Sequence, residues 1–203
     1  MGKSGLRERN KERTRDDIIE AALGLFEERG YDATRCEDIA AAADVSVRTF
    51  FRYFDAKPDV VMATTGDKRP DETFIADLLS RPSAEGPVTA FRNMMRAPIA
   101  QFELGRTLEV RQTLLMLTTP GLESLLLEHF RRIESVLVGA IATRLDRPAD
   151  DLDAWLLAAA LCAAMRIAFV RWANSGAQPG TLWPLLQARL DRLEHGFAAL
   201  HLA

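Results

Sequence analysis

The spacing of apolar residues near the start of the chain predicts an amphipathic helix. From Arg13 onward they recur at positions i, i+1, i+4, i+7 and i+8, which places them on one stripe of a helix. These residues are Ile18, Ile19, Ala22, Leu25 and Phe26. Gly30 follows the stripe, and glycine at such a position usually ends a helix with a positive φ. The pattern predicts a first helix between Arg13 and Gly30.

A second helix and a tight turn are predicted next. Thr34 stands three residues before Glu37, and this spacing resembles a capping box, in which each side chain satisfies a backbone N–H at a helix start. Asp44 and Val45 follow the short apolar pattern of that helix. Aspartate tolerates the left-handed conformation better than most residues. We therefore expect the second helix to end in a turn at Asp44.

Capping residues also predict a third and a fourth helix. Ser46 is suited to cap a short helix from Val47 to about Tyr53, and Asp55 is suited to cap the next helix, with Pro58 in its first turn. Two short helices that follow a longer one across a tight turn form a helix-turn-helix. The second helix of that motif enters the DNA major groove and places its N-terminal residues at the base edges.

The remainder of the chain reads as a helical body. Prolines lie near most of the expected boundaries, since proline interrupts helices. Helices are expected near 57–68, 71–80, 87–103, 105–117, 121–146, 150–175 and 181–201. The composition agrees, because 30 Ala and 27 Leu outnumber 10 Phe, 3 Trp and 2 Tyr and Ala and Leu favour helices. We therefore predict an all-α fold.

Charge limits what kind of nucleic-acid site the chain can carry. The net charge is −3 over 203 residues, which excludes a histone-like polycation and requires a local basic patch. Residues 1–57 hold 11 basic and 12 acidic residues. The acids gather on the first helix, whereas residues 1–12 and the third helix carry arginines and lysines, so we expect charge to be segregated within this region. Residues 1–12 read as a disordered basic arm, either a solvated tail or a phosphate contact.

Several classes of protein are not expected. The longest apolar run is Ala154–Met165, little more than half of the roughly 20 residues that a membrane span needs, and no secretory signal opens the chain. Cys36 and Cys162 are far apart in sequence and form no metal-spaced pair. We therefore expect a cytoplasmic protein with no membrane partner, no metal and no cofactor.

The motif region resembles the DNA-binding part of the TetR (tetracycline-repressor-like) family. The resemblance rests on residues 13–61, which agree with the family in register at Thr14-Arg15, Ile19–Ala22, Leu25-Phe26, Gly30-Tyr31, Thr34, Ile39-Ala40, Val45-Ser46, Thr49, Tyr53-Phe54 and Lys57. It implies about nine helices, with three N-terminal helices for operator DNA and a body that binds a small molecule and dimerises. The expected divisions are an arm at 1–12, a DNA-binding domain at 13–57 and a body at 58–203.

The resemblance also implies which residues contact DNA. The candidates are Thr34, Arg35, Ser46, Val47, Arg48, Thr49, Arg52, Tyr53 and Lys57. Positions 34, 53 and 57 correspond to phosphate contacts, whereas 47–49 fall where the family reads bases. Arg48 is the best base reader, because an arginine fork on guanine gives about 1–3 kcal/mol of discrimination. Phe51 stands where the family usually has Tyr, and Asp44 where it usually has Gly.

The body carries a second, more diffuse resemblance. Its positions Arg111, Leu114-Leu115, Thr118–Pro120, Leu122, Glu134, Arg144 and Arg171-Trp172 are similar to an acyl-CoA-sensing branch that includes the mycofactocin-associated regulator. Methionines among large aromatic residues favour an adaptable apolar pocket. The expected lining is Phe91, Met94, Met95, Phe102, Arg111, Leu115, Phe130, Met165 and Phe169. Arg111 either fixes the polar group of a ligand, lies at a solvated edge or takes part in an internal salt bridge.

The last two helices are expected to form a homodimer. Their apolar faces contribute Trp155, Ala158, Leu161, Leu182, Leu186, Leu193 and Phe197. A twofold dimer would present two recognition helices to a near-palindromic operator in double-stranded DNA, with half-sites about 34–36 Å apart.

The leading hypothesis is therefore a repressor that a small apolar ligand, such as an acyl-CoA, releases from its operator. One alternative is a helical small-molecule binding protein or enzyme with a vestigial helix-turn-helix, and another is an activator. No catalytic residues are expected, since the sequence shows no Ser/His/Asp order, metal cluster or glycine-rich phosphate loop.

Overall fold

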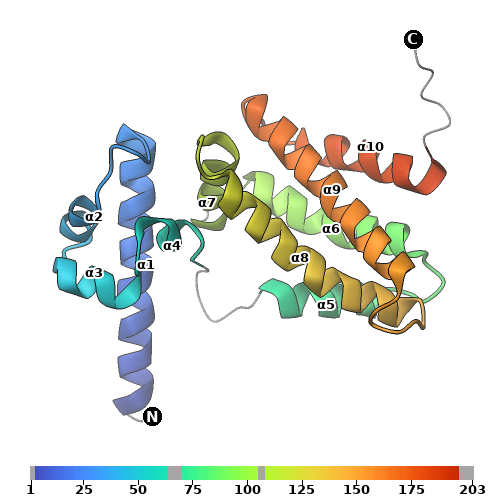
Figure 1. Cartoon of the computed structure of the whole chain (residues 1–203), viewed down its shortest axis with the longest axis horizontal. Coiled ribbons are helices and arrows are strands. Elements are labelled where there is room, and N and C mark those ends of the chain that lie inside the picture. Colours follow the sequence, from blue (N-terminus) through green and yellow to red (C-terminus); the bar gives the residue numbers. More distant parts are fainter. Residues whose placement is uncertain (1–2, 64–69, 105–107, 197–203) are drawn as a thin grey trace. The chain divides into compact units, whose positions relative to one another are not determined.

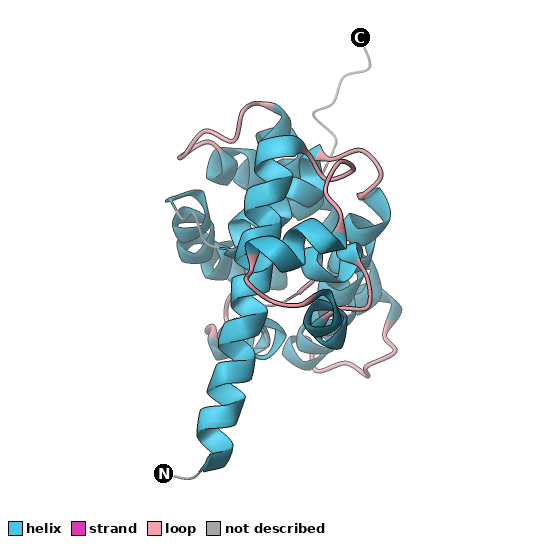
Figure 2. Ribbon diagram, turned by 90° about the vertical axis from the view of Figure 1, so that its left-hand side faces the viewer, coloured by secondary structure: helices cyan, strands magenta, loops and turns pink. Residues whose placement is uncertain are grey.

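The protein is all-helical throughout the part of the chain that the structure describes. This computed structural model describes residues 3–63, 70–104 and 108–196, and Figure 2 shows helices and loops with no strand among them. The described residues form ten helices, as many as the sequence pattern predicts and one more than the family resemblance implies. The chain divides into two compact units, residues 1–68 with 107–125 and residues 69–106 with 126–203. The predicted body, 58–203, is therefore divided, because the segment at 107–125 folds with the N-terminal unit.

The first unit contains the predicted helix-turn-helix. Its helices are α1 (Lys3–Arg29), α2 (Cys36–Ala42), α3 (Val47–Tyr53), α4 (Lys57–Val61) and α7 (Leu108–Thr118). Helix α1 packs against α2, α4 and α7, while α2 packs against α3, and Figure 1 shows α2 and α3 on the same side of α1. The buried stripe of α1 is Ile18, Ile19, Ala22, Leu23 and Phe26. This agrees with the predicted stripe except that Leu23 replaces the half-buried Leu25.

Two predictions for the ends of α1 have opposite outcomes. The C-terminal end is confirmed, because α1 ends at Arg29 and Gly30 has a φ of 89°. The disordered arm is wrong for residues 3–12, since α1 begins at Lys3. This segment consists mainly of Arg, Lys and Glu, which are good helix formers, so the helix can extend without an apolar stripe.

The predicted caps of α2 and α4 are each displaced by one residue. Arg35 is the N-cap of α2, and its backbone N–H donates to the Asp38 carboxylate at 3.0 Å. Ala56 is likewise the N-cap of α4, with its N–H donating to Asp59 at 2.8 Å. In both cases a carboxylate three residues into the helix satisfies the N-cap, as in the reciprocal half of a capping box. Helix α4 ends at Val61; residues 64–68 of the expected helix 57–68 lie outside the described residues.

The second unit contains the remaining helices. These are α5 (Pro70–Ser80), α6 (Pro87–Leu104), α8 (Glu123–Arg144), α9 (Leu152–Asn174) and α10 (Leu182–His195). Helix α10 packs against α9 and α6, and α5 packs against α6. Arg144, at the end of α8, donates to the carbonyl oxygens of Leu78, Arg81, Pro82 and Glu85. This guanidinium thus binds one carbonyl in the last turn of α5, which has no partner within that helix, and three carbonyls of the segment between α5 and α6.

Helix α9 is the central apolar helix of the second unit. By length and composition alone it could cross a membrane, although its longest uninterrupted apolar run is short. Ten of its residues, from Ala154 to Ala173, are buried within the protein. Such burial is typical of the core helix of a folded domain, so α9 gives only weak support for a membrane span.

Candidate nucleic-acid interface

The start of α3 is fixed by its own polar residues. Asp44 adopts the predicted left-handed conformation with a φ of 53°, and Val45 N–H donates to the carbonyl of Ala40 at 2.9 Å. Ser46 is the N-cap, as predicted, and its Oγ accepts from the backbone N–H of Thr49 at 3.0 Å. The Ser46 and Thr49 hydroxyls are also 2.8 Å apart. The turn and the first turn of α3 are therefore held in one geometry.

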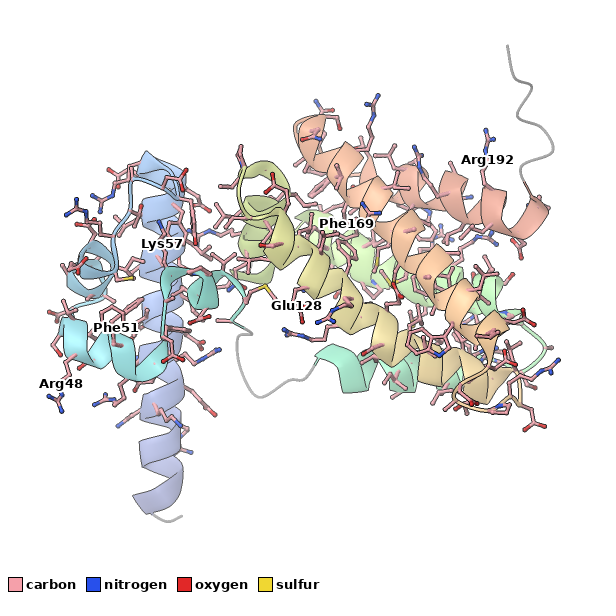
Figure 3. All side chains as sticks on the ribbon, in the orientation of Figure 1. Arg48, Phe51, Lys57, Glu128, Phe169 and Arg192 are labelled. Atoms are coloured by element: carbon pink, nitrogen blue, oxygen red, sulfur yellow. The ribbon has the colours of Figure 1, made fainter. Side chains whose placement is uncertain are left out.

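One face of α3 is exposed and the other is buried. Phe50 is fully buried and Phe54 is 4% exposed, so both belong to the core. The exposed face carries Val47, Arg48, Phe51 and Arg52. Figure 3 shows Arg48 projecting away from α3. This arrangement is what a recognition helix needs, because its outward side chains must reach the base edges.

Aromatic contacts order the side chains beside this face. The guanidinium of Arg52 lies over the Tyr53 ring at 5.3 Å, which is within cation–π range. Tyr53 is half-buried, whereas Arg35 is exposed at the start of α2. Arg35 and Arg52 can therefore supply exposed positive charge at the start of α2 and in the last turn of α3.

Two of the predicted phosphate contacts have other partners in the structure. Thr34 is 1% exposed, and its hydroxyl donates to the carbonyl of Gly30 at 2.9 Å. The Lys57 ammonium donates to the carbonyls of Tyr31 at 2.6 Å and Thr34 at 3.0 Å, and it lies 4.0 Å from the centre of the Tyr31 ring. Both side chains thus hold the loop between α1 and α2. The sequence could not reveal this, because Lys57 is 26 residues from Tyr31.

The acidic side of α1 is partly neutralised by α7. Arg111 makes a two-bond contact with Glu27, at 2.7 and 2.8 Å, and a further bond to Glu20 at 2.5 Å. Hydrogen bonding to Glu27 is the largest cause that raises the pKa of Arg111 above its usual range. The next residue, Gln112, donates to the carbonyls of Val60 and Ala63. Helix α7 is thus joined to both α1 and the end of α4.

These contacts correct part of the expected ligand site. Arg111 takes the salt-bridge alternative, and the half-buried Leu115 also lies on α7 in the first unit. The other seven candidates are in the second unit, namely Phe91, Met94, Met95, Phe102, Phe130, Met165 and Phe169. All of these except Phe102 are buried. Phe102 lies 5.1 Å from Phe169 and 5.8 Å from Trp172 between ring centres. Trp172 is not among the predicted lining residues, yet it belongs to this aromatic cluster.

The expected dimer residues also differ in their accessibility. Four of them, Ala158, Leu161, Leu182 and Leu186, are fully buried in their own unit. They are therefore not available to a partner surface, which corrects the prediction. Trp155 is 46% exposed and Leu193 is half-buried, while Phe197 lies outside the described residues.

The apolar side chains that are exposed on α9 share only Trp155 with the predicted dimer residues. They are Leu152, Trp155, Leu156 and Ile167, which share one side of the helix given 3.6 residues per turn. A groove of about 480 Å³ lies beside the end of α9. Its lining is Arg171, Ser175, Gly180, Thr181, Pro184, Leu185, Ala188 and Arg189. The exposed set could have been found by placing the apolar residues of α9 on two opposite stripes rather than one.

Comparison with known proteins agrees with both halves of the chain. Residues 18–64 match the family model for bacterial regulatory proteins of the tetR family. Residues 85–198 match the model for the MftR C-terminal domain, which confirms the resemblance to that branch.

Individual relatives extend the same result. The chain is 38% identical to the HTH-type transcriptional regulator TcmR of Streptomyces glaucescens over 153 residues, or 72% of this chain and 67% of that protein. Two solved structures share the fold. Thermus thermophilus FadR in complex with lauroyl-CoA has a TM-score of 0.55 at 24% identity, over 92% of this chain and 96% of that one. NalD, a repressor of a multidrug efflux pump in Pseudomonas aeruginosa, has a TM-score of 0.64 at 18% identity, over 91% and 96%.

TetR-family regulators bind DNA operators and small-molecule ligands and act as dimers, and the helix-turn-helix described above supplies the DNA-binding element. The match to the C-terminal model covers more than half of the chain. This protein belongs to the TetR family of DNA-binding transcriptional regulators.

Proposed function

We propose that this protein is a repressor that reads a near-palindromic operator with α3. The observation that carries the proposal is the exposed face of α3 beside a rigidly capped N-terminus. Arg48 lies on that face, and its fork can donate two hydrogen bonds to a guanine. We assign phosphate contacts to Arg35, at the N-cap of α2, and to Arg52 and Tyr53, in the last turn of α3.

DNA binding under competition tests this proposal. The purified protein is offered the region flanking its own gene and a duplex selected from a random library, each with excess unrelated DNA and a salt titration. Arg48→Ala should weaken specific binding by about 10- to 100-fold and leave weak non-specific binding. Arg131→Ala is the matched control, because Arg131 is a surface arginine on α8 that pairs with Glu128.

If competitor DNA removes the protein from every fragment, α3 does not read sequence. A helical binding protein or enzyme with a vestigial helix-turn-helix would then be the better description.

We further propose that the second unit binds an apolar acyl-CoA-like ligand that releases the operator. The cluster of Phe102, Phe169 and Trp172, with methionines nearby in sequence on α6 and α9, supports an adaptable apolar site. Thermus thermophilus FadR, which shares the fold, was solved with lauroyl-CoA. For the ligand to release the operator, it must bind more tightly to a dimer geometry that does not fit the operator than to the geometry that does. A coupling free energy of about 2–3 kcal/mol between the ligand site and the operator site is sufficient.

Lauroyl-CoA is the probe for this second proposal, with free CoA as the control for the acyl chain. We expect lauroyl-CoA to quench or enhance the fluorescence of tryptophan and to weaken operator binding by about 30- to 150-fold. A Phe169→Leu variant should reduce both effects while preserving operator binding without ligand. Tight binding of lauroyl-CoA that leaves operator affinity unchanged would contradict the mechanism.

We also propose that the working form is a cytoplasmic, non-enzymatic homodimer. Four exposed apolar residues on α9, including Trp155 and Leu156, support a partner surface there, because such patches mark interaction sites. Leu156→Asp should convert a dimer of twice 22.6 kDa into a monomer by light scattering. Leu127→Asp is the control, as Leu127 is 58% exposed on α8. A dimeric Leu156→Asp protein would place the interface elsewhere.

A further inference from the structure

The apolar side chains on the exposed face of α3 have no obvious structural purpose. Val47 is 39% exposed and Phe51 is 46% exposed, although both stand on a helix whose buried side is already filled by Phe50 and Phe54. They are one turn apart, at positions i and i+4, and therefore point to the same side of α3. If this surface contacts DNA, the exposed valine and phenylalanine side chains would be buried favourably only against an apolar group of the DNA.

The geometry of Phe51 is that of a supported side chain. Its ring lies 5.3 Å from the fully buried Phe50 ring, at an interplanar angle of 89°. Edge-to-face pairs of this kind are favourable, so Phe51 is held by the core rather than free to collapse onto the surface. Val47 is the first residue of α3, directly after the Ser46 cap, and its branched side chain has few rotamers.

The DNA major groove offers one apolar group among its hydrogen-bonding edges, the 5-methyl group of thymine. We propose that Val47 and Phe51 are specificity-determining residues that contact thymine methyl groups, while Arg48 between them donates to a guanine. This inference rests on the proposed function and names what the operator must contain.

The helix also sets the spacing of these features. Four residues of an α-helix rise about 6 Å, which is roughly the height of two base pairs at 3.4 Å each. Val47 and Phe51 therefore reach thymines that lie no more than about two base pairs apart along the groove. The guanine read by Arg48 lies within the same short half-site, since Arg48 is next to Val47.

Deoxyuridine provides a direct test, because it differs from thymidine only in lacking the methyl group. The operator is first selected from a random duplex library with the full-length protein, and each thymidine of a half-site is then replaced in turn. We expect about a fourfold loss of affinity for each contacted methyl group, at two positions no more than about two base pairs apart. Thymidines outside the half-sites serve as matched controls and should show no loss.

Variants assign each methyl group to a residue. With Val47→Ala, the deoxyuridine replacement at one position should cost nothing further, whereas the other position keeps its fourfold effect. With Phe51→Ala, the replacement at the second position should cost nothing further, whereas the first position keeps its fourfold effect. Phe51→Leu should reduce the effect at the second position without abolishing it. Replacing the guanine by 7-deazaguanine, which lacks the N7 acceptor, should weaken wild-type binding but not binding by Arg48→Ala.

These experiments distinguish a failure of the thymine contacts from a failure of the proposed operator binding, on which those contacts rest. If the protein retains a specific duplex but no deoxyuridine replacement weakens binding, the inference is overturned and the regulator remains. If no duplex survives competition, the proposed function fails and the inference fails with it. Because the wild-type experiment needs no substitution in the protein, a Phe51 variant that folds poorly does not affect the result.

Discussion

At the scale of single residues, the polar side chains of the first unit, which contains the helix-turn-helix and is called the DNA-binding unit below, are of two kinds. Some hydrogen-bond to the protein's own backbone, and others extend into solvent, where they can contact DNA. Thr34 and Lys57 satisfy carbonyl groups of the α1–α2 loop, whereas Arg48 extends from an exposed face. A position that matches a family's DNA contact can therefore act indirectly, by shaping the surface that meets the phosphate backbone.

Lys57 provides a prediction at this scale. Lys57→Met should lower the free energy of unfolding by about 1.5–3 kcal/mol, because two carbonyls lose a charged donor. Urea unfolding followed by circular dichroism measures the change. Arg48→Met is the control in the same unit and should stay within about 0.5 kcal/mol of the wild type. Equal stability of Lys57→Met and wild type would mean that Lys57 is free to bind phosphate.

At the scale of elements, α7 is the unexpected member of the DNA-binding unit. Its sequence pattern does not distinguish it from the helices of the predicted body. In the structure, however, Arg111 hydrogen-bonds to α1 and Gln112 hydrogen-bonds to the end of α4. Gln112 is 4% exposed, so its amide is committed to those carbonyls. A displacement of α7 would thus act on two helices of the DNA-binding unit at once.

A double-mutant cycle between Arg111 and Glu27 tests the strength of this connection. The Arg111 side chain is 18% exposed and Glu27 is 53% exposed, so solvent screens the pair and we expect a coupling of about 1 kcal/mol. Arg111→Ala, Glu27→Gln and the double variant are compared by urea unfolding at low and high salt. The Arg131–Glu128 pair, at 76% and 45% exposure, is the control and should couple by less than about 0.5 kcal/mol. A coupling near zero for Arg111 and Glu27 would show that α7 is held by Gln112 and packing alone.

At the scale of the whole molecule, the two cysteines report on the two units separately. Burial raises the pKa of Cys162 to about 12, with Glu134 as a lesser cause, and the side chain is 3% exposed. Burial also raises the pKa of Cys36, which is only half-buried. One thiol thus lies in each unit, and the two differ in their access to solvent.

Alkylation at pH 8 should therefore be ordered. Iodoacetamide should modify Cys36 in the folded protein and Cys162 only after unfolding, as followed by peptide mass spectrometry. Because the folded pKa of Cys162 exceeds the value of about 8.5 in an unfolded chain, the unfolded state loses its proton first. The contribution of the Cys162 thiol to the free energy of unfolding should then fall as the pH rises above about 8.5. Cys162→Ala should remove that part of the pH dependence, and rapid native labelling of Cys162 would contradict its burial.

The sequence predicted most of the helical fold because local signals determine it. The apolar stripe of α1, the Ser46 cap and the turn at Asp44 depend on neighbours within a few residues, and all three are present. The pairing of Arg111 with Glu27 spans 84 residues, and no local pattern encodes such a contact. The buried dimer candidates were misjudged for a related reason, since an apolar helix has two sides and the pattern does not say which faces its own core.

The left-handed turn at Asp44 has a consequence for how freely this position can change. A side chain with positive φ strains the native backbone by about 1 kcal/mol, which glycine would relieve. Glycine would also widen the range of conformations open to the denatured chain, at an entropic cost of about 0.4–1 kcal/mol on folding. The two effects nearly cancel, so Asp44 and glycine are close to equivalent in stability. Substitution of Asp44 by glycine, or the reverse, would therefore leave the fold and the orientation of α3 unchanged. Selection at this turn can then act on the charge of the side chain alone.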